Sequence, residues 1–138
     1  MNLNTYLSFD GTCAEAMRFY EKTLEGGKLE GMMKWSEMPG AGAEAQNAGD
    51  RIMHASLSLP GGRSLMASDC RPGQPYQKMQ GITLSLGFAS LDEAKKIFDA
   101  LAVGGQVTMP LQKTFWSEGF GMLTDRFGTP WMANVEHG

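Results

Sequence analysis

The side chain best suited to proton transfer in this sequence is His54, because imidazole has the free pKa nearest neutrality. The other histidine, His137, stands in the C-terminal tail, where we expect it to be frayed and idle. Residues 52–59 alternate as in a strand, which places His54 on a polar face with Ser56 and Ser58. If the apolar face packs on a helix, His54 faces a cavity and could act there as a general acid or base. A purely structural hydrogen bond is the alternative.

Three aromatic side chains could form the wall of a pocket for an apolar ligand. Trp35, Phe115 and Trp116 stand at the ends of two predicted strands, beside irregular stretches. A dimer contact or a hydrophobic plug is the alternative, since aromatics are common in both settings. Gly119 and Gly121 favour a pocket at Trp116, because glycine at a strand entry indicates a bulge or a close approach by another group. We therefore expect Trp116 to report ligand binding.

Methionine is abundant, with 11 among 138 residues. These side chains could line a site with adaptable, polarizable groups, or they could simply fill the core. Met66 and Met132 belong to the last strands of two repeated units described below. Trp131 precedes Met132, so if Met132 faces a cavity, alternation directs Trp131 under a helix.

The two cysteines, Cys13 and Cys70, form neither a C-x-x-C motif nor a Cys/His cluster. The sequence places no cation or histidine beside either thiol that would activate it, so we expect both to be buried and inert. No signal peptide is recognisable at the start, and the cytoplasm is the expected location.

The composition is that of one soluble domain large enough to bury a core. The chain has 42% hydrophobic and 20% charged residues, a net charge of -3 and no cluster of Lys and Arg. Nucleic acid is therefore not an expected partner. No apolar run approaches the roughly 20 residues needed to span a bilayer, so no membrane partner is expected either.

The segments that position these residues come in two similar units. Residues 5–29 read as a strand followed by a helix, and residues 83–107 repeat that pattern. Leu7 falls on Leu84 at an offset of 77 residues, and the helices with their Gly-Gly ends follow at an offset of 78. Each helix start is predicted to be a capping box, Thr12 with Glu15 and Ser90 with Glu93.

Each unit ends in a strand, a tight turn and a strand. Residues 58–68 overlie residues 124–134 at an offset of 66, which places Met66 on Met132. The turn at 125–128 has the Asp and Gly that turns favour. Further strands are predicted over 28–35 and 106–113.

The predicted fold class is therefore α+β, with two tandem βαβββ modules that form a curved mixed sheet around a cavity. The modules are residues 1–69 and 81–136 of a single domain, joined by a linker over 70–80. Residues 36–50 occur only in the first module. They are rich in Gly and Ala, so we expect a mobile loop without fixed secondary structure, either a lid or a disordered excursion.

The motifs "YLSFDG", "HASLSLPGGRSLMASD" and "TFWSEGFGMLTDRFGTPWMANVE", set in a duplicated βαβββ unit, resemble the glyoxalase, bleomycin-resistance and extradiol-dioxygenase superfamily, also called vicinal oxygen chelate proteins. Within it the chain looks like the PhnB-like group. The resemblance covers nearly the whole chain. It implies two modules whose sheets surround a cavity, often in a homodimer, and in the metalloenzymes four ligands, typically His, Glu, His and Glu.

Those four ligand positions fall on Met66 and Met132 in the last strands, and on Thr83 and the stretch from Asn4 to Tyr6 in the first strands. None holds a histidine or a carboxylate. Thioether sulfur suits Cu(I) rather than the divalent ions of this superfamily, so we predict that the usual metal is absent and no cofactor is required, although a divalent ion held by other ligands stays open.

The resemblance and the residues together predict a homodimeric small-molecule-binding protein. The expected binding residues are Tyr6, Trp35, His54, Met66, Thr83, Phe115, Trp116 and Met132. Two alternatives stay open at this point. The protein could be an enzyme, either metal-dependent or using His54 as an acid or base, or a resistance protein that sequesters its ligand unchanged.

Overall fold

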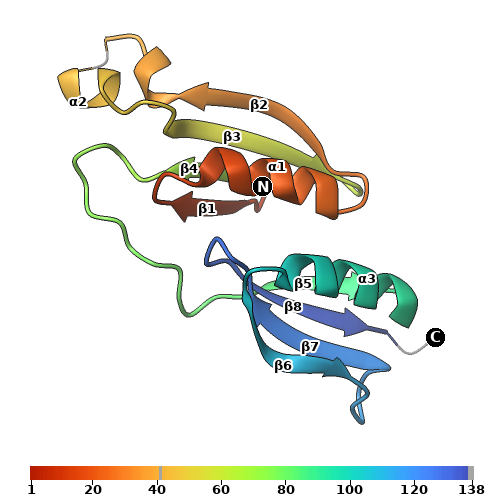
Figure 1. The fold of residues 1–138 in the computed structure, drawn as a ribbon. Coiled ribbons are helices and arrows are strands. Elements are labelled where there is room, and N and C mark those ends of the chain that lie inside the picture. Colours follow the sequence, from red (N-terminus) through yellow and green to blue (C-terminus); the bar gives the residue numbers. More distant parts are fainter. Residues whose placement is uncertain (41, 137–138) are drawn as a thin grey trace. The chain divides into compact units, whose positions relative to one another are not determined.

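The computed structural model describes residues 1–40 and 42–136 and has an α+β architecture in two compact units, Met1–Lys78 and Met79–Gly138. Each unit runs strand, helix, strand, strand, strand, and the N-terminal unit has two further short helices (Figure 1). The predicted tandem βαβββ modules are confirmed. The N-terminal unit includes residues 70–78, most of the segment predicted as a linker.

The N-terminal unit forms one four-stranded mixed sheet with a helix on one face. Its elements are β1 (Thr5–Phe9), α1 (Cys13–Thr23), β2 (Lys28–Lys34), the 3-10 helix η1 (Trp35–Glu37), α2 (Ala43–Gln46), β3 (Ile52–Leu59) and β4 (Arg63–Asp69). The strand order is β1-β4-β3-β2, with β1 parallel to β4 and the other neighbours antiparallel. Helix α1 packs on β2, β3 and β4.

The C-terminal unit has the same architecture. Its elements are β5 (Leu84–Phe88), α3 (Leu91–Ala102), β6 (Gln106–Gln112), β7 (Gly119–Thr124) and β8 (Pro130–Val135). The strand order is β5-β8-β7-β6, again with only the first pair parallel. Over residues 1–40 and 42–136, no helix is both long and apolar enough to cross a membrane.

Alternation along the strands builds the core of each unit. In the N-terminal sheet, Leu57 stands opposite Leu65 and Ala55 opposite Ala67, and all four are buried under α1. The matching face of α1 is also fully buried, with Cys13, Ala16, Met17 and Tyr20. In the C-terminal unit the corresponding buried side chains of α3 are Ala94, Ile97, Phe98 and Leu101.

The repeat is confirmed, but its first strand is displaced by two residues from the predicted register. β1 pairs Leu7 with Ala67, and β5 pairs Leu86 with Ala133. Leu7 therefore corresponds to Leu86, at an offset of 79 residues, and not to Leu84. The sequence pattern misled us because a shift of two residues leaves every side chain on the same face of a strand.

The two helices begin in different ways. At α3 the hydroxyl of Ser90 accepts the backbone N–H of Glu93 at 3.2 Å, as the predicted capping box requires. At α1 the Thr12 side chain makes no cap hydrogen bond, so the capping box predicted there is wrong. The carboxylate of Asp69, at the end of β4, accepts backbone N–H groups at this helix start instead.

The ends of the two helices match. Gly26 and Gly104 both have φ of 75°, in the left-handed region that glycine adopts without strain. A side chain at Gly26 would also collide with Pro60, because an added Cβ would lie 2.5 Å from its Cγ. Glycine is therefore required at the first of these two positions for space as well as for conformation.

The prediction that residues 36–50 lack fixed secondary structure is wrong. Helix η1 continues to Glu37, and α2 occupies Ala43–Gln46. In α2 the N–H of Gln46 donates to the carbonyl of Gly42 at 3.0 Å. Alanine has the highest helix propensity, which favours a turn of helix in a segment with few bulky side chains. Ala41 lies outside the described residues, and the role of this segment as a lid stays a prediction.

Candidate functional site

The face of the N-terminal sheet opposite α1, here called the open face, brings together three of the predicted site residues. Tyr6 of β1 pairs with Met66 of β4, so these side chains share a face. Met66 also pairs with Ser56 of β3, which places His54 on the same face two residues earlier. Met33 of β2 pairs with His54. Tyr6 is 49% exposed and Met33 44% exposed, so a ligand can reach this face.

The Tyr6 hydroxyl and the His54 ring are in direct contact. The hydroxyl oxygen lies 3.0 Å from Nδ1 of His54, and the ring centroids are 5.7 Å apart. In the neutral imidazole, either the hydroxyl donates to Nδ1 and Nε2 carries the proton, or Nδ1–H donates and Nε2 is an acceptor. The contact therefore orients the ring and sets which role Nε2 can offer to a bound molecule.

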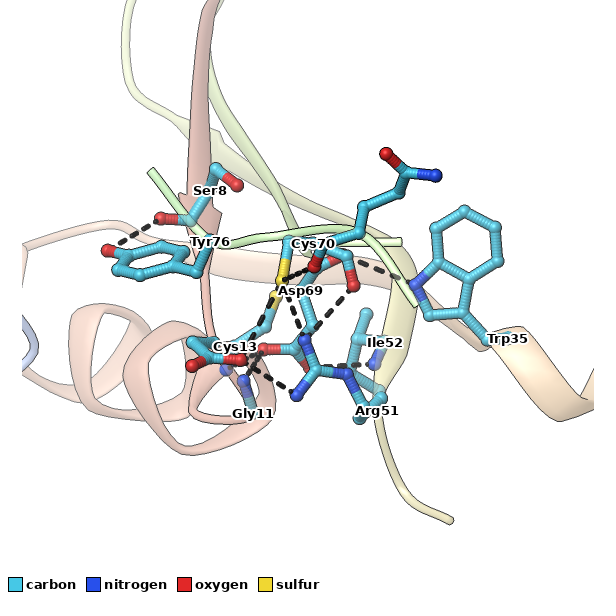
Figure 2. A network of polar contacts seen from close by, with 11 residues as sticks. Ser8, Gly11, Cys13, Trp35, Arg51, Ile52, Asp69, Cys70 and Tyr76 are labelled. Carbon is cyan, nitrogen blue, oxygen red and sulfur yellow. Dashed lines mark hydrogen bonds and ion pairs between the residues drawn. The ribbon is translucent and has the colours of Figure 1, made fainter. Parts of the chain in front are cut away.

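Trp35 lies elsewhere in this unit, at the start of η1. Its Nε1 donates a hydrogen bond to the backbone carbonyl of Asp69 at 3.2 Å, as Figure 2 shows. The half-buried side chain lines a cavity of about 310 Å³ together with Met38, Arg71, Pro72 and residues of α2. Trp35 therefore does have an accessible cavity beside it, but in a different place from the Tyr6–His54 pair.

A second cavity in the N-terminal unit, of about 410 Å³, is lined by Asp10, Arg51 and Cys70 among others. Arg51 Nη2 lies 2.9 Å from Sγ of Cys70 and 3.0 Å from the carbonyl oxygen of the same residue. Its Nη1 lies 3.1 Å from Oδ1 of Asp10. Figure 2 shows the guanidinium beside the sulfur. Cys70 is half-buried, so the prediction of a buried thiol without a neighbouring cation is wrong here.

The sequence did contain a signal for this pair. The β3–β4 hairpin pairs Leu59 with Arg63 and Ala55 with Ala67. Continuing that antiparallel register beyond the two strands brings the residue before β3 next to the residues after β4. Arg51 and Cys70 occupy those positions, although they are 19 residues apart in the chain.

Cys13, in contrast, is a buried thiol as predicted. It is 0% exposed at the start of α1. Burial raises the pKa of the Cys13 thiol to about 12, and the nearby Asp69 carboxylate adds to the increase. The thiol is therefore protonated at neutral pH.

Asp69 is the residue that fixes this end of the unit. Its carboxylate is 0% exposed. Oδ1 accepts the backbone N–H groups of Gly11 at 2.7 Å and Cys13 at 3.0 Å, and Oδ2 accepts that of Ile52 at 2.8 Å (Figure 2). One side chain thus joins the loop after β1, the start of α1 and the start of β3. Because Arg51 precedes Ile52, the same contacts hold the guanidinium in place beside the second cavity.

In the C-terminal unit, Met132 of β8 pairs with Ser85 of β5 and with Met122 of β7. Thr83 precedes β5 and takes no part in the pairing. The residue of β5 beside Met132 is therefore Ser85, which corresponds to Tyr6 of the first unit. Thr83, which the resemblance suggested as the first-strand position, lies two residues before Ser85.

Phe115 and Trp116 form an aromatic cluster with Phe120 in the C-terminal unit. Trp116 packs edge-on against both neighbours, with centroid distances of 4.7 Å to Phe115 and 5.5 Å to Phe120. Phe115 is 94% exposed and Trp116 50% exposed. Their role in ligand binding stays a prediction.

The glycines that follow Trp116 have a packing explanation. A Cβ at Gly121 would lie 2.9 Å from Cα of Leu111, in the neighbouring strand β6, and 3.0 Å from the Phe98 ring. At Gly119 it would lie 2.7 Å from the side chain of Leu91. A close approach was predicted, and the groups that approach belong to the unit's own strand and helix.

Trp131 packs in the core, as alternation predicted. It is 3% exposed, and its Nε1 donates to Oδ2 of Asp125 at 2.8 Å. The other oxygen of Asp125 accepts the backbone N–H groups of Phe127 and Thr129 at 2.9 and 3.0 Å. The turn chemistry predicted for residues 125–128 is present.

Comparison with known proteins identifies the family. A family model described as 3-demethylubiquinone-9 3-methyltransferase matches residues 1–133. The chain belongs to this family. Protein YjdN of Escherichia coli (strain K12) is 38% identical over 143 aligned residues, which cover 98% of this chain and 95% of that protein.

Solved structures agree with this assignment. Protein PA1353 from Pseudomonas aeruginosa is 44% identical with a TM-score of 0.90, covering 100% of this chain and 99% of that chain. A putative 3-demethylubiquinone-9 3-methyltransferase, PhnB protein, from Bacillus cereus is 25% identical with a TM-score of 0.80, covering 98% and 99%. The chain is a PhnB-like protein, as the motifs indicated.

The fold is that of the glyoxalase/bleomycin-resistance group. A glyoxylase/bleomycin resistance protein/dioxygenase domain from Frankia sp. EAN1pec is 18% identical with a TM-score of 0.67, covering 99% of this chain and 92% of that chain. At this identity the likeness concerns the fold alone, because one fold supports many activities.

The predicted absence of the superfamily's metal site rests on the chemistry of the residues at its ligand positions. The resemblance places the last-strand positions on Met66 and Met132, and thioethers are poor ligands for divalent ions. Within residues 1–40 and 42–136, no group of three His, Cys, Asp or Glu side chains could hold a metal ion. That the purified protein carries no divalent metal stays a prediction.

Proposed function

We propose that this PhnB-like protein binds a small organic molecule on the open face of its N-terminal sheet, without the divalent metal used elsewhere in the superfamily. The observation that supports the proposal is the 3.0 Å contact between the Tyr6 hydroxyl and His54 Nδ1 on an exposed face. A phenol and an imidazole already oriented by each other bind a ligand with less loss of side-chain entropy.

The chemistry of the open face favours a ligand with both an apolar part and a polar oxygen. The thioethers of Met33 and Met66 provide adaptable apolar contacts. Nε2 of His54 provides one hydrogen bond, and the hydroxyl of Ser56 lies on the same face. This combination holds an aromatic or aliphatic compound by its apolar surface and orients it by one or two hydrogen bonds.

The remaining predicted contacts extend the proposal. Trp35, Thr83, Phe115, Trp116 and Met132 stay predicted binding residues, and a cytoplasmic homodimer stays the expected assembly. Each of the five side chains is tested by the same binding experiment, since a true contact changes the affinity when its side chain is shortened. Trp116→Phe is expected to weaken binding and to leave the fold intact.

A second candidate function is proton transfer by His54. The observation that favours it is the same contact, because a hydrogen bond to Nδ1 sets the tautomer and leaves Nε2 to exchange a proton with a bound substrate. Product formation in the presence of a bound compound distinguishes an enzyme from a protein that sequesters its ligand unchanged.

The proposal is tested by a thermal-shift screen of small aromatic and aliphatic organic compounds, using protein purified without chelator. S-adenosylmethionine is included because the family description names methyl transfer. A specific ligand at 100 times its Kd stabilises the native state by about 2.7 kcal/mol. Elemental analysis of the same preparation is expected to find no stoichiometric Zn, Ni, Mn or Fe.

The variants Tyr6→Phe and His54→Ala are expected to reduce the stabilisation by the ligand that the screen finds. Ser64→Ala is the matched control, because Ser64 lies on the same face and its hydroxyl contacts only Asn4 among the bonds described. Equal stabilisation of all variants would contradict the proposal, as would about one divalent ion per chain that is lost with His54→Ala.

A further inference from the structure

The second cavity of the N-terminal unit contains a nucleophile, a base and a cation in mutual contact. Cys70 Sγ lies 3.7 Å from Oδ1 of Asp10, a distance at which the thiol can donate to the carboxylate. Sγ also lies 3.9 Å from the carbonyl oxygen of Gln74. Arg51 bridges the other two, at 2.9 Å from Sγ and 3.1 Å from the same carboxylate oxygen.

This arrangement meets the geometric requirement for an activated nucleophile. The base must lie within hydrogen-bond reach of the nucleophile and must itself be oriented by a third group. Asp10 satisfies the first condition, and its ion pair with Arg51 satisfies the second. The guanidinium also lies close enough to the sulfur to stabilise negative charge on it.

The position of the cluster gives it both rigidity and access. Asp69 holds the ends of β3 and β4 from the buried side, so Arg51 and Cys70 stand on fixed backbone. The cavity of about 410 Å³ opens beside them and is large enough for a small molecule. Tyr76 lies near the cluster, and its hydroxyl donates a hydrogen bond to the carbonyl oxygen of Ser8 at 3.5 Å. Burial raises the pKa of Tyr76, followed by the charges of Asp10 and Cys70.

We propose that Cys70, Asp10 and Arg51 form a nucleophilic thiol site that adds to small α,β-unsaturated carbonyl compounds. Asp10 accepts the thiol proton as the sulfur forms a bond to the β-carbon of the acceptor. The C=C π bond breaks, and its electron pair moves toward the carbonyl oxygen. A second guanidinium, Arg71, lines the same cavity and stabilises the negative charge on that oxygen.

The reaction is completed by return of the proton from Asp10 to the α-carbon. The product is a thioether in which the former thiol hydrogen of Cys70 is bonded to the α-carbon. No oxidant or reductant is consumed. Cys13 takes no part, because it is 0% exposed and protonated at neutral pH.

The test uses N-ethylmaleimide as the electrophile and the intact native chain at pH 7, with peptide mass spectrometry to locate the adduct. We expect one adduct per chain, at Cys70 and not at Cys13. We expect Cys70 to react about tenfold faster than the free thiol of glutathione, since a positioned base contributes at least that much.

Asp10→Asn and Arg51→Lys are expected to bring the rate at Cys70 close to that of glutathione. Asp10 has a side chain that is 57% exposed, so its substitution preserves the fold, and a melting curve verifies this. Arg63→Met is the matched control, because it removes a positive charge at the other end of the same hairpin and leaves the rate unchanged.

Three outcomes overturn the proposal. These are that Cys70 reacts no faster than glutathione, that Asp10→Asn leaves the rate at Cys70 unchanged, and that Cys13 is modified first in the folded protein. The open-face ligand site is not involved in any of these measurements, so its success or failure is judged separately.

Discussion

The two units of this protein share one fold, but different polar contacts stabilise their loops and strand ends. Each contains a buried aspartate whose carboxylate accepts three N–H donors, Asp69 in the first unit and Asp125 in the second. The donors to Asp69 lie between 17 and 58 residues away in the chain. The donors to Asp125 lie between 2 and 6 residues away.

Because their donors lie at different distances along the chain, the two carboxylates position different segments. Asp125 organises its own turn and holds Trp131 in the core of the second unit. Asp69 connects the loop after β1, the start of α1 and the start of β3, and thereby sets the end of the hairpin where Arg51 and Cys70 meet. A repeat can therefore keep its backbone while a single long-range anchor gives one copy a polar cavity.

The largest effect is expected for removal of the long-range anchor. Asp69→Ala leaves three N–H groups without their acceptor, two of them buried, and we expect it to lower the free energy of unfolding by about 5 kcal/mol. Urea titration followed by circular dichroism measures the loss. Asp125→Ala is the matched variant, expected to destabilise but to leave the labelling rate of Cys70 unchanged. Equal labelling of Cys70 in wild type and Asp69→Ala would contradict the positioning role of Asp69.

The tryptophans of the second unit test its local core. Trp131 is 3% exposed, and Trp131→Ala is expected to cost about 4 kcal/mol of unfolding free energy, as for other buried aromatics. Trp116 is 50% exposed and packs edge-on against Phe115 and Phe120, so Trp116→Ala is expected to cost about 1 kcal/mol or less. Thermal melting of both variants measures the two losses of stability. A larger loss for Trp116→Ala than for Trp131→Ala would contradict the placement of Trp131 in the core.

The helix starts provide a smaller and sharper contrast. Ser90→Ala removes the cap of α3 and is expected to cost about 1 kcal/mol. Thr12→Ala removes no cap hydrogen bond at α1 and is expected to cost a few tenths of a kcal/mol, roughly the value for a surface substitution. Equal losses in the two variants, measured by urea titration, would mean that Thr12 does cap α1.

The last expected effect concerns the pH dependence of stability. Burial raises the pKa of Cys13 from 9.0 to about 12, so the unfolded chain loses this proton first as pH rises. The stabilisation from the protonated thiol is complete below pH 9 and is lost as pH approaches 12. Between pH 8 and 10 we expect a loss of about 1 kcal/mol that Cys13→Ala abolishes. An identical pH dependence of wild type and Cys13→Ala would show that the thiol is not buried in solution.

The sequence sufficed to predict the eight strands, the two long helices and the buried positions, because alternation and helical spacing are local patterns. It failed where contacts depend on distant residues. The Thr12 capping motif was locally complete, but Asp69, 57 residues further along the numbering, supplies the acceptor. A Gly- and Ala-rich composition hid α2, since one turn of helix leaves no periodicity to detect.

The candidate sites show the same division. His54, Met66 and Tyr6 lie on one face, and alternation along each strand is enough to indicate the face that each side chain occupies. The Tyr6–His54 contact itself depends on which strands are neighbours, and the pairing of Arg51 with Cys70 depends on the hairpin register. Neither contact can be predicted from a short stretch of sequence alone.

The measurement that tests the account most directly uses the methionine methyl groups as reporters. The protein, labelled with ¹³C at these methyls, is titrated with the ligand found in the thermal-shift screen and followed by two-dimensional NMR. We predict that the signals of Met33 and Met66 on the open face shift, while those of Met38 beside the Trp35 cavity and of buried Met17 do not. Shifts at Met38 with Met33 and Met66 unchanged would contradict the open face as the ligand site.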